Sequence, residues 1–263
     1  MKLTFKNHFN IKRTLKNKID WLFLKSMQGS VHLEKNNRIG RIQFFHPKGN
    51  SLPSSLLQNL VKTFETAEDD PDIGVIILES EGNTFCAGAS LTELKGVKTL
   101  EEGTAFFMGF ANLLNTIRKM SKFVLASVHG KVVGGGVGLV SACDYAFATE
   151  TASLKLSELS IGLGPYVIEP AVSRKIGSTA FAQLSLDSTH WKSAQWGLQK
   201  GLYAECVPDR EALDRTVNEN AEIWANYAPE ACRELRKLHW KDTQNWESLL
   251  PENAKITAQL ALS

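Results

Sequence analysis

Two short runs of apolar residues, each followed directly by a loop that contains glycine, most constrain how this chain can fold. The runs are residues 75–78 and 123–128. An unbroken apolar run of this length is typical of a strand that is covered on both faces, as in the parallel sheets of α/β proteins. The sequence therefore predicts a buried sheet with loops of unusual backbone geometry at its edge.

Helices and further strands follow in an order that supports this prediction. Alternation of apolar and polar residues predicts a strand at 39–45, and apolar spacing predicts helices from Pro53 and Ser54 onward and at 100–118. Short strands are expected at 145–149 and 153–156, and helices near 171–176, 179–186, 191–199, 210–227 and 229–239. This order indicates an α/β fold with a helical last third.

The glycines suggest what the two loops do. Gly88 permits a sharp turn that aims the next N–H group, that of Ala89, outward. The second loop, residues 128–139, runs into a helix, where the first N–H groups are free and lie at the positive end of the helix dipole. Two N–H groups that converge on one point make an oxyanion hole. We expect one at Ala89 and one at Gly135.

Other interpretations of these loops differ in how well they fit. The spacing Gly134-x-Gly136-x-Gly138 does not match a dinucleotide-binding loop, and no acidic residue ends a second strand about 20 residues on. The chain has no Gly-Lys-Ser/Thr of a P-loop and no Gly-x-Ser-x-Gly elbow. A purely structural glycine turn stays open for either loop taken alone.

Taken together and in this order, three stretches resemble the crotonase superfamily of enoyl-CoA hydratases and isomerases. They are 85–94, 129–144 and 156–165, with Phe85-Cys86-Ala87-Gly88-Ala89, His129-Gly130, Cys143-Asp144 and Leu156-Ser157-Glu158. The resemblance runs from about residue 31 to residue 240. It implies a spiral of repeated ββα units, with an acyl-CoA-binding core at 27–190 and a helical C-terminal trimerisation region at 191–263. It also implies a homotrimer or a dimer of trimers.

The resemblance implies roles residue by residue. The N–H groups of Ala89 and Gly135 would bind the thioester oxygen of an acyl-CoA, with the CoA along 48–52 and 87–92. Coenzyme A is then part of the substrate, and neither a separate cofactor nor a metal is expected. The implied substrate-binding residues are Lys48, Ser51, Leu52, Ala87, Ser90, Leu91, Thr92, Gly134, Pro165, Tyr166 and Glu169.

The resemblance also matches Glu158 to one of the two glutamates that many members place at the reacting carbons. Glu158 is therefore the expected proton shuttle, since a carboxylate beside an oxyanion hole can move the proton of an α or γ carbon. Many members of the superfamily have a second glutamate three residues after the oxyanion glycine, where this chain has Gly138. With one carboxylate a proton shift between carbons is simpler than hydration, as in Δ3,Δ2-enoyl-CoA isomerases. Glu169 either replaces the missing carboxylate or caps a helix.

Several alternatives remain open from the sequence. Breakdown of fatty or amino acids by a hydratase/isomerase is the leading function, and decarboxylation, thioester hydrolysis and a non-catalytic acyl-CoA-binding subunit are the rivals. Phe106, Phe107 and Phe110 either line an acyl tunnel or belong to the core. Many members reach a neighbour's CoA with a further C-terminal helix, and we expect that contact to be absent or replaced here.

The composition of the chain bears on which further classes of function are expected. Residues 1–26 hold seven Lys or Arg against one acid, and the rest of the chain is mildly acidic, which does not favour nucleic-acid binding. That basic stretch is either a disordered extension before a start at Met27 or a membrane-surface or targeting segment. The sequence contains no run of about 18 apolar residues, so no membrane span is expected. The four cysteines lack metal-site spacing and are expected to be reduced thiols in a cytoplasmic protein.

Overall fold

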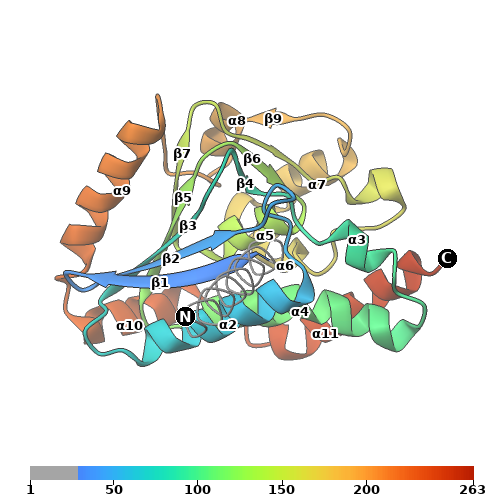
Figure 1. Cartoon of the computed structure of the whole chain (residues 1–263), viewed down its shortest axis with the longest axis horizontal. Helices are drawn as coiled ribbons and strands as arrows, with labels where there is room; N and C mark the ends of the chain where they lie inside the picture. Colours follow the sequence, from blue (N-terminus) through green and yellow to red (C-terminus); the bar gives the residue numbers. More distant parts are fainter. Residues whose placement is uncertain (1–28) are drawn as a thin grey trace, which may run out of the picture.

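The computed structural model describes residues 29–263, so the predictions for the basic stretch 1–26 lie outside it. The described residues form two sheets with helices around them (Figure 1). The larger sheet has the order β1 (Ser30–Asn36), β2 (Ile39–Phe45), β3 (Val75–Ser80), β5 (Phe123–Val128), β7 (Tyr145–Thr149) and β10 (Glu205–Val207). The smaller sheet has the order β4 (Thr84–Cys86), β6 (Lys131–Val133), β8 (Ser153–Lys155) and β9 (Lys192–Ser193).

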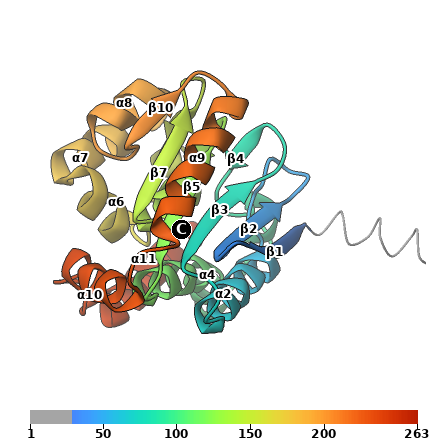
Figure 2. The same ribbon diagram turned by 90° about the vertical axis from the view of Figure 1, so that its left-hand side faces the viewer.

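Strand β3 is covered on both faces, as its unbroken apolar run predicts. Ile76 and Leu78 belong to the main core, under α2 (Ser54–Asp69) and α4 (Leu100–Lys119). Val75 and Ile77 point to the opposite face, where they pack against α9 (Arg210–Trp224). Figure 2 shows α9 lying across that face of the sheet. Successive side chains of a strand point to opposite faces, so only an unbroken apolar run can fill both cores.

The smaller sheet positions the loops that carry the predicted chemistry. Strands β4 and β6 pair in parallel, as do β6 and β8, while β9 is antiparallel to β8. Parallel neighbours end at the same edge of a sheet, so the segments that follow the three strands must lie side by side. These segments are residues 87–90, 134–135 and 157–158. The sequence predicts only β8 of these strands, because β4 and β6 lie within the two glycine-containing loops and β9 has only two residues.

Most helices up to residue 200 lie where the sequence predicts them, but the helix predicted at 191–199 begins only at residue 194, because Lys192 and Ser193 form β9. Helix α4 starts with a capping box, in which Thr99 and Glu102 bond to each other's backbone N–H. Helix α5 (Gly135–Ala142) begins within the second glycine loop, with Gly134 as its N-cap. The shorter helices are α3 (Leu91–Leu94), the 3₁₀ helix η1 (Glu158–Ile161), α6 (Glu169–Ile176), α7 (Ser178–Leu186) and α8 (Ala194–Gln199).

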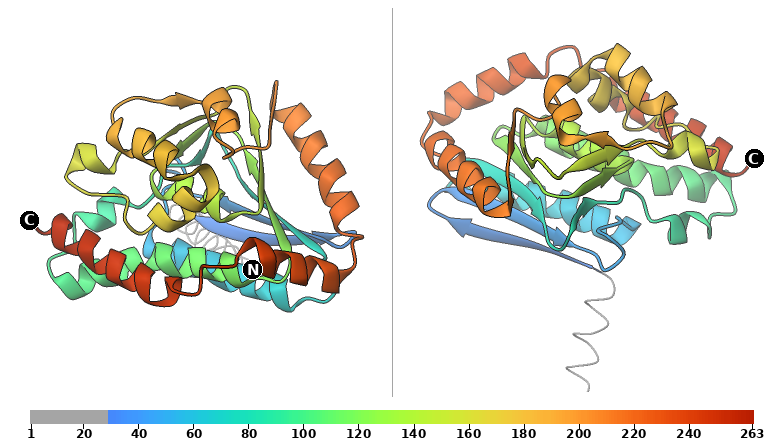
Figure 3. Two further views of the ribbon diagram at one scale, coloured as in Figure 1. Left: turned by 180° about the vertical axis from the view of Figure 1, so that it is seen from behind. Right: turned by 90° about the horizontal axis from the view of Figure 1, so that it is seen from above.

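The last third is helical, as predicted, and it adds one helix that the sequence pattern does not reveal. After α9 and α10 (Pro229–His239), α11 (Trp246–Ala261) runs along α4, as Figure 3 shows from behind. The close approach depends on small residues, because a Cβ on Gly103 would lie 2.9 Å from the Cβ of Ala258. The main core takes side chains from both 27–190 and 191–263, for example Ile42 and Trp246. The predicted boundary and the trimer role stay predictions.

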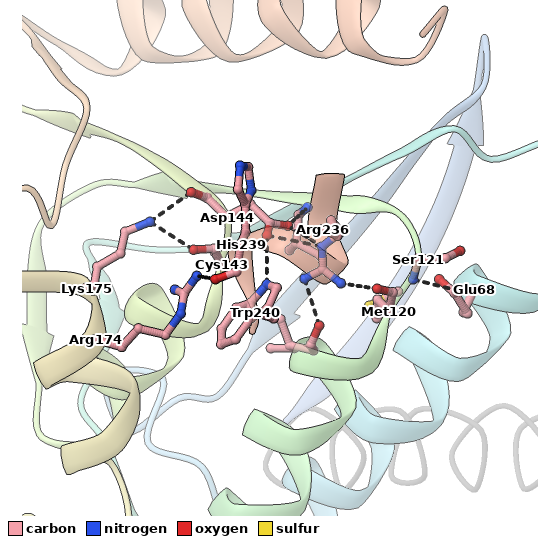
Figure 4. A network of polar contacts seen from close by, with 12 residues as sticks. Glu68, Met120, Ser121, Cys143, Asp144, Arg174, Lys175, Arg236, His239 and Trp240 are labelled. Carbon is pink, nitrogen blue, oxygen red and sulfur yellow. Dashed lines mark hydrogen bonds and ion pairs between the residues drawn. The ribbon is translucent and has the colours of Figure 1, made fainter. Parts of the chain in front are cut away.

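A buried ion pair attaches α10 to the core (Figure 4). The guanidinium of Arg236 is 2% exposed and its Nε donates to both carboxylate oxygens of Asp144, at 3.1 and 2.9 Å. Its other nitrogens donate to the carbonyls of Ile117 and Met120, at the C-terminal end of α4. Trp240 Nε1 donates to Asp144 as well, at 3.1 Å. Asp144, noted in the sequence only as part of a motif, thus anchors the C-terminal helices.

Candidate active site

A cavity of about 170 Å³ lies where β4, β6 and β8 of the smaller sheet end. Among the described residues that line it, Glu158 is the only one with an ionisable side chain, and most of the others are apolar or glycine. The lining residues are Ala87, Gly88, Ala89, Leu91, Leu94, Phe107, Phe110, Val133, Gly134, Gly135, Ser157, Glu158, Ile161, Leu163, Gly164, Pro165, Val167, Ile168 and Thr257.

The first loop presents the N–H group of Ala89 to this cavity. Ala89 forms a parallel bridge with Leu52, in which Leu52 N–H donates to the Gly88 carbonyl at 2.8 Å and Ser90 N–H donates to the Leu52 carbonyl at 3.3 Å. Successive N–H groups of an extended chain point to opposite sides, so the N–H of Ala89 points away from Leu52. Within residues 29–263 it has no hydrogen-bond acceptor.

The second loop presents the N–H group of Gly135. Gly134 has a φ of +53° and is held on both sides, because its N–H donates to the Lys155 carbonyl at 2.9 Å and its carbonyl accepts from Val137 N–H at 2.8 Å. Gly135 is the first residue of α5, where a helix leaves its N–H groups unpaired. Its N–H also has no acceptor in the described part of the chain.

The two loops approach each other closely, and only glycine permits the approach. A Cβ atom on Gly88 would lie 2.8 Å from the carbonyl oxygen of Val133 and 3.2 Å from the nitrogen of Gly135. Gly88 also has a φ of +80°, in the left-handed region that glycine adopts without strain. The geometry therefore brings the predicted pair of N–H donors, Ala89 and Gly135, to one wall of the cavity.

Glu158 lies on the adjacent wall, at the first position of η1. Its Oε1 is so close to Gly134 that a Cβ there would come within 2.8 Å of it. Its Oε2 is out of contact with solvent and has no hydrogen-bond partner among the described residues. Burial raises the pKa of Glu158 from 4.5 to about 7, against the smaller opposite effect of backbone N–H groups at Ser157 and Glu158. A carboxyl with this pKa can both accept and return a proton near neutral pH.

Gly138 lies one turn into α5, where no side chain could be added without displacing Ile168. A Cβ on Gly138 would lie 2.5 Å from Cγ2 of Ile168 and 2.7 Å from its Cβ. Ile168 is 4% exposed and lines the cavity. The position at which the sequence resemblance expects a second carboxylate is thus filled by a hydrocarbon side chain.

Some of the predicted substrate-binding residues line the cavity and others lie beside it. Ala87, Leu91, Gly134 and Pro165 line it, together with Ala89, Gly135 and Glu158. Lys48, Ser51, Leu52, Ser90, Thr92, Tyr166 and Glu169 do not.

The residues that lie beside the cavity have identifiable contacts. The exposed Lys48 donates from Nζ to Oγ1 of Thr92 at 3.1 Å, which places both on the surface that leads to the first loop. Ser51 is buried against Nδ1 of His46 at 3.1 Å. Ser90 caps α3, where its Oγ accepts from Glu93 N–H at 3.3 Å. Ser51 and Ser90 therefore hold the loops in shape.

Tyr166 and Glu169 line a second, neighbouring cavity together with Leu159 and Phe181. Glu169 lies in the first turn of α6, and its side chain makes no capping hydrogen bond. Glu169 therefore lines the neighbouring cavity, and it is not among the described residues that line the cavity with Glu158.

Tertiary structure adds residues that no local pattern marks. For Phe107 and Phe110 the sequence left open whether they line an acyl tunnel or belong to the core. Both are buried in the main core, and both also line the cavity. Ile168 and Thr257 also line it. The apolar spacing of 100–118 could have indicated the two phenylalanines, but no sequence signal indicates a threonine on an unpredicted helix.

His129 and the four cysteines do not line this cavity. His129 is buried with both ring nitrogens unpartnered in the described residues, and burial lowers its pKa to about 4. The four cysteines are free thiols. In the described part of the chain no helix is both long and apolar enough to cross a bilayer.

Comparison with known proteins agrees with this geometry. Residues 34–261 match the family model described as "Enoyl-CoA hydratase/isomerase". The chain is 26% identical over 228 residues to a Bacillus subtilis (strain 168) protein named "Probable enoyl-CoA hydratase", covering 86% of this chain and 88% of that protein. It is 30% identical over 175 residues to "Enoyl-CoA hydratase AKT6-1" of Alternaria alternata, covering 66% of this chain but only 56% of that protein.

A solved structure shows the same fold. The crystal structure of an enoyl-CoA hydratase from Mycobacterium avium superimposes with a TM-score of 0.80 at 25% identity, covering 89% of this chain and 91% of that one. The family match spans nearly all of the described residues and includes both glycine loops and Glu158. The chain therefore belongs to the enoyl-CoA hydratase/isomerase family and has the crotonase-type fold that its sequence predicts.

Proposed function

We propose that this protein is an enoyl-CoA isomerase that moves a carbon–carbon double bond between the β,γ and α,β positions of an acyl-CoA thioester. The observation that carries the proposal is the single ionisable side chain, that of Glu158, among the described residues that line the cavity. Hydration needs one group to activate water and a proton donor for the α carbon, whereas a proton shift between two carbons needs one carboxylate.

The proposed reaction uses three groups of this chain. The N–H groups of Ala89 and Gly135 donate hydrogen bonds to the thioester oxygen. The Glu158 carboxylate takes a proton from the α carbon, and the electron pair moves toward the carbonyl to give a dienolate whose negative oxygen the two N–H groups stabilise. The Glu158 carboxylic acid then returns the proton to the γ carbon. The double bond ends in conjugation with the carbonyl, and Glu158 is again a carboxylate.

The apolar lining supports this chemistry in two ways. It raises the pKa of Glu158 to about 7, so that the carboxylate is basic enough to take a carbon-bound proton. It also gives a low effective dielectric around the two N–H donors, in which hydrogen bonds to a developing oxyanion are stronger than in water.

The test is product identification with two substrates. With 3-hexenoyl-CoA, we expect conjugated 2-hexenoyl-CoA to form, followed by its ultraviolet absorbance and by mass spectrometry. In deuterated water, we expect deuterium at the γ carbon, because Glu158 exchanges its proton with solvent in some turnovers. Glu158→Gln should abolish both signals while the protein still binds acyl-CoA. The proposal is wrong if 3-hexenoyl-CoA is unchanged by pure, folded wild-type protein.

Hydration is the second candidate, because the relatives identified above carry the name enoyl-CoA hydratase. Crotonyl-CoA separates the two functions, since it has a conjugated double bond to hydrate. We expect at most slow formation of 3-hydroxybutyryl-CoA. Hydration faster than isomerisation would favour the second candidate and require a water-activating group other than Glu158.

We further propose that the helical C-terminal region assembles the protein into homotrimers or dimers of trimers, in line with the family resemblance. Exposed apolar side chains on the last two helices, such as Leu235, Leu238 and Ile256, are consistent with an interface there. Light scattering coupled to size-exclusion chromatography would give the mass of the assembly, and a monomeric mass would contradict this proposal.

A further inference from the structure

We propose that Thr257 on α11 closes the acyl end of the cavity and limits the length of the acyl chain that the enzyme accepts. The inference rests on the proposed function, because it assigns the apolar part of the same cavity to the acyl chain.

The two ends of the cavity differ in exposure. Leu91 and Ile161, which line it, are 53% and 49% exposed, so they mark the side that is open to solvent. Thr257 lines it too but is only 3% exposed, so it belongs to the part of the lining that is closed to solvent. A thioester held at Ala89 and Gly135 would keep its polar CoA portion toward solvent. Its acyl chain would enter the apolar closed part.

The backbone of α11 cannot easily move to make room. It packs along α4, where Gly103 and Ala258 are in close contact. Asn253, one turn before Thr257, donates from Nδ2 to the Tyr166 carbonyl at 2.9 Å and so ties α11 to the loop after η1. Thr257 Oγ1 donates to the Asn253 carbonyl at 2.7 Å, which leaves the hydroxyl already satisfied within the helix. Thr257 therefore acts on a ligand through its size.

Binding of saturated acyl-CoAs tests this limit without any turnover. We would measure the Kd of acetyl-, butyryl-, hexanoyl-, octanoyl- and decanoyl-CoA by titration calorimetry. For the wild type, affinity should rise about fourfold per methylene up to the chain that fills the cavity and then fall. For Thr257→Ala, which removes about two non-hydrogen atoms, we expect the optimum at a chain about one to two carbons longer. Thr257→Leu should shift it to a shorter chain.

Two further variants make the result specific. Thr257→Val keeps the shape and should leave the profile unchanged, which separates size from the hydroxyl group. Gln259→Ala changes an exposed residue of the same helix and should also leave it unchanged. If Thr257→Ala does not fold, the shift with Thr257→Leu and its absence with Thr257→Val still test the proposal.

The outcomes separate this inference from the proposed function. Affinity that rises steadily to decanoyl-CoA, or Thr257→Ala and Thr257→Leu profiles that superimpose on that of the wild type, would overturn the role of Thr257. An optimum that moves with the size of residue 257, in a protein that isomerises no enoyl-CoA, would support the inference and overturn the function.

Discussion

Gly138 and Ile168 lie so close that a single methyl group on Gly138 would come within 2.5 Å of Cγ2 of Ile168. The two residues belong to different helices, α5 and the start of α6, and both are buried. The resemblance to crotonases expects a carboxylate at Gly138 in members with two glutamates. In this chain Ile168 takes that space, which makes the site a one-carboxylate site for steric reasons.

Gly138→Ala should therefore destabilise the fold by overpacking, by about 1–3 kcal/mol. Ile168→Gly alone should also destabilise it, because it leaves a cavity. The double variant should be more stable than the sum of the two changes predicts, by about 0.5–3 kcal/mol. Urea denaturation of the four proteins measures this coupling, and strict additivity would show that the two side chains do not compete for one space.

Gly88→Ala should impair activity far more than Gly82→Ala. Both glycines have positive φ, +80° and +77°, so backbone strain alone should cost about 1–2 kcal/mol of stability in each variant. A Cβ on Gly82 meets nothing within 4 Å, whereas a Cβ on Gly88 would strike the Val133 carbonyl and approach the Gly135 nitrogen. We expect kcat to fall on the order of 10²–10³-fold in Gly88→Ala only. Equal losses in both variants would argue against an oxyanion hole at this position.

The rate of isomerisation should depend on the ionisation of Glu158. Because the carboxylate is the base, kcat/KM should rise with pH, pass its midpoint at about 7 and then level off. Glu158→Gln should lower kcat on the order of 10²–10⁴-fold at every pH. The exposed Glu252→Gln on α11 is the control and should keep the wild-type profile. A midpoint near 4.5 in the wild type would contradict the buried position of Glu158.

The same pKa predicts a pH dependence of stability. Folding raises the pKa of Glu158 from 4.5 to about 7, so between these values the folded state binds more protons than the unfolded chain. The contribution of Glu158 to the free energy of unfolding is fully present below about pH 4.5, and it is lost as the pH rises through about 7. Relative to Glu158→Gln, the wild type should lose on the order of 3 kcal/mol between pH 4.5 and pH 8. Chemical denaturation at several pH values measures the difference, and a constant difference would refute the shift.

Arg236→Ala should be strongly destabilising, because it leaves the buried Asp144 carboxylate and the carbonyls of Ile117 and Met120 without their partner. Removing one member of a buried ion pair costs about 3–5 kcal/mol. Arg233→Ala, an exposed arginine on the same helix, should change the free energy of unfolding by no more than about 0.5 kcal/mol. Similar unfolding midpoints for the two variants would show that the Arg236 network contributes little.

Much of the fold and part of the site follow from local rules that a sequence reveals. The apolar run at 75–78 predicts a strand buried on both faces, and β3 is one. Gly88 and Gly134 adopt backbone angles that favour glycine, so the two loops can be recognised without knowing what surrounds them. By contrast β4 and β6 lie within the two glycine-containing loops, so the sequence does not predict them as strands. Helix α11 has Pro251 inside it, which interrupts the helical signal.

The sequence by itself indicated the α/β class and the two N–H-bearing loops, because these depend on the backbone preferences of neighbouring residues, and its resemblance to crotonases marked Glu158 as the proton shuttle. Only the tertiary structure decided that Ile168 fills the space beside Gly138, that Glu169 lines another cavity and that Thr257 lines the site. These relations join residues as far apart in the sequence as Ala87 and Thr257. They arise from close packing, in which a side chain's neighbours depend on how whole helices and sheets pack together.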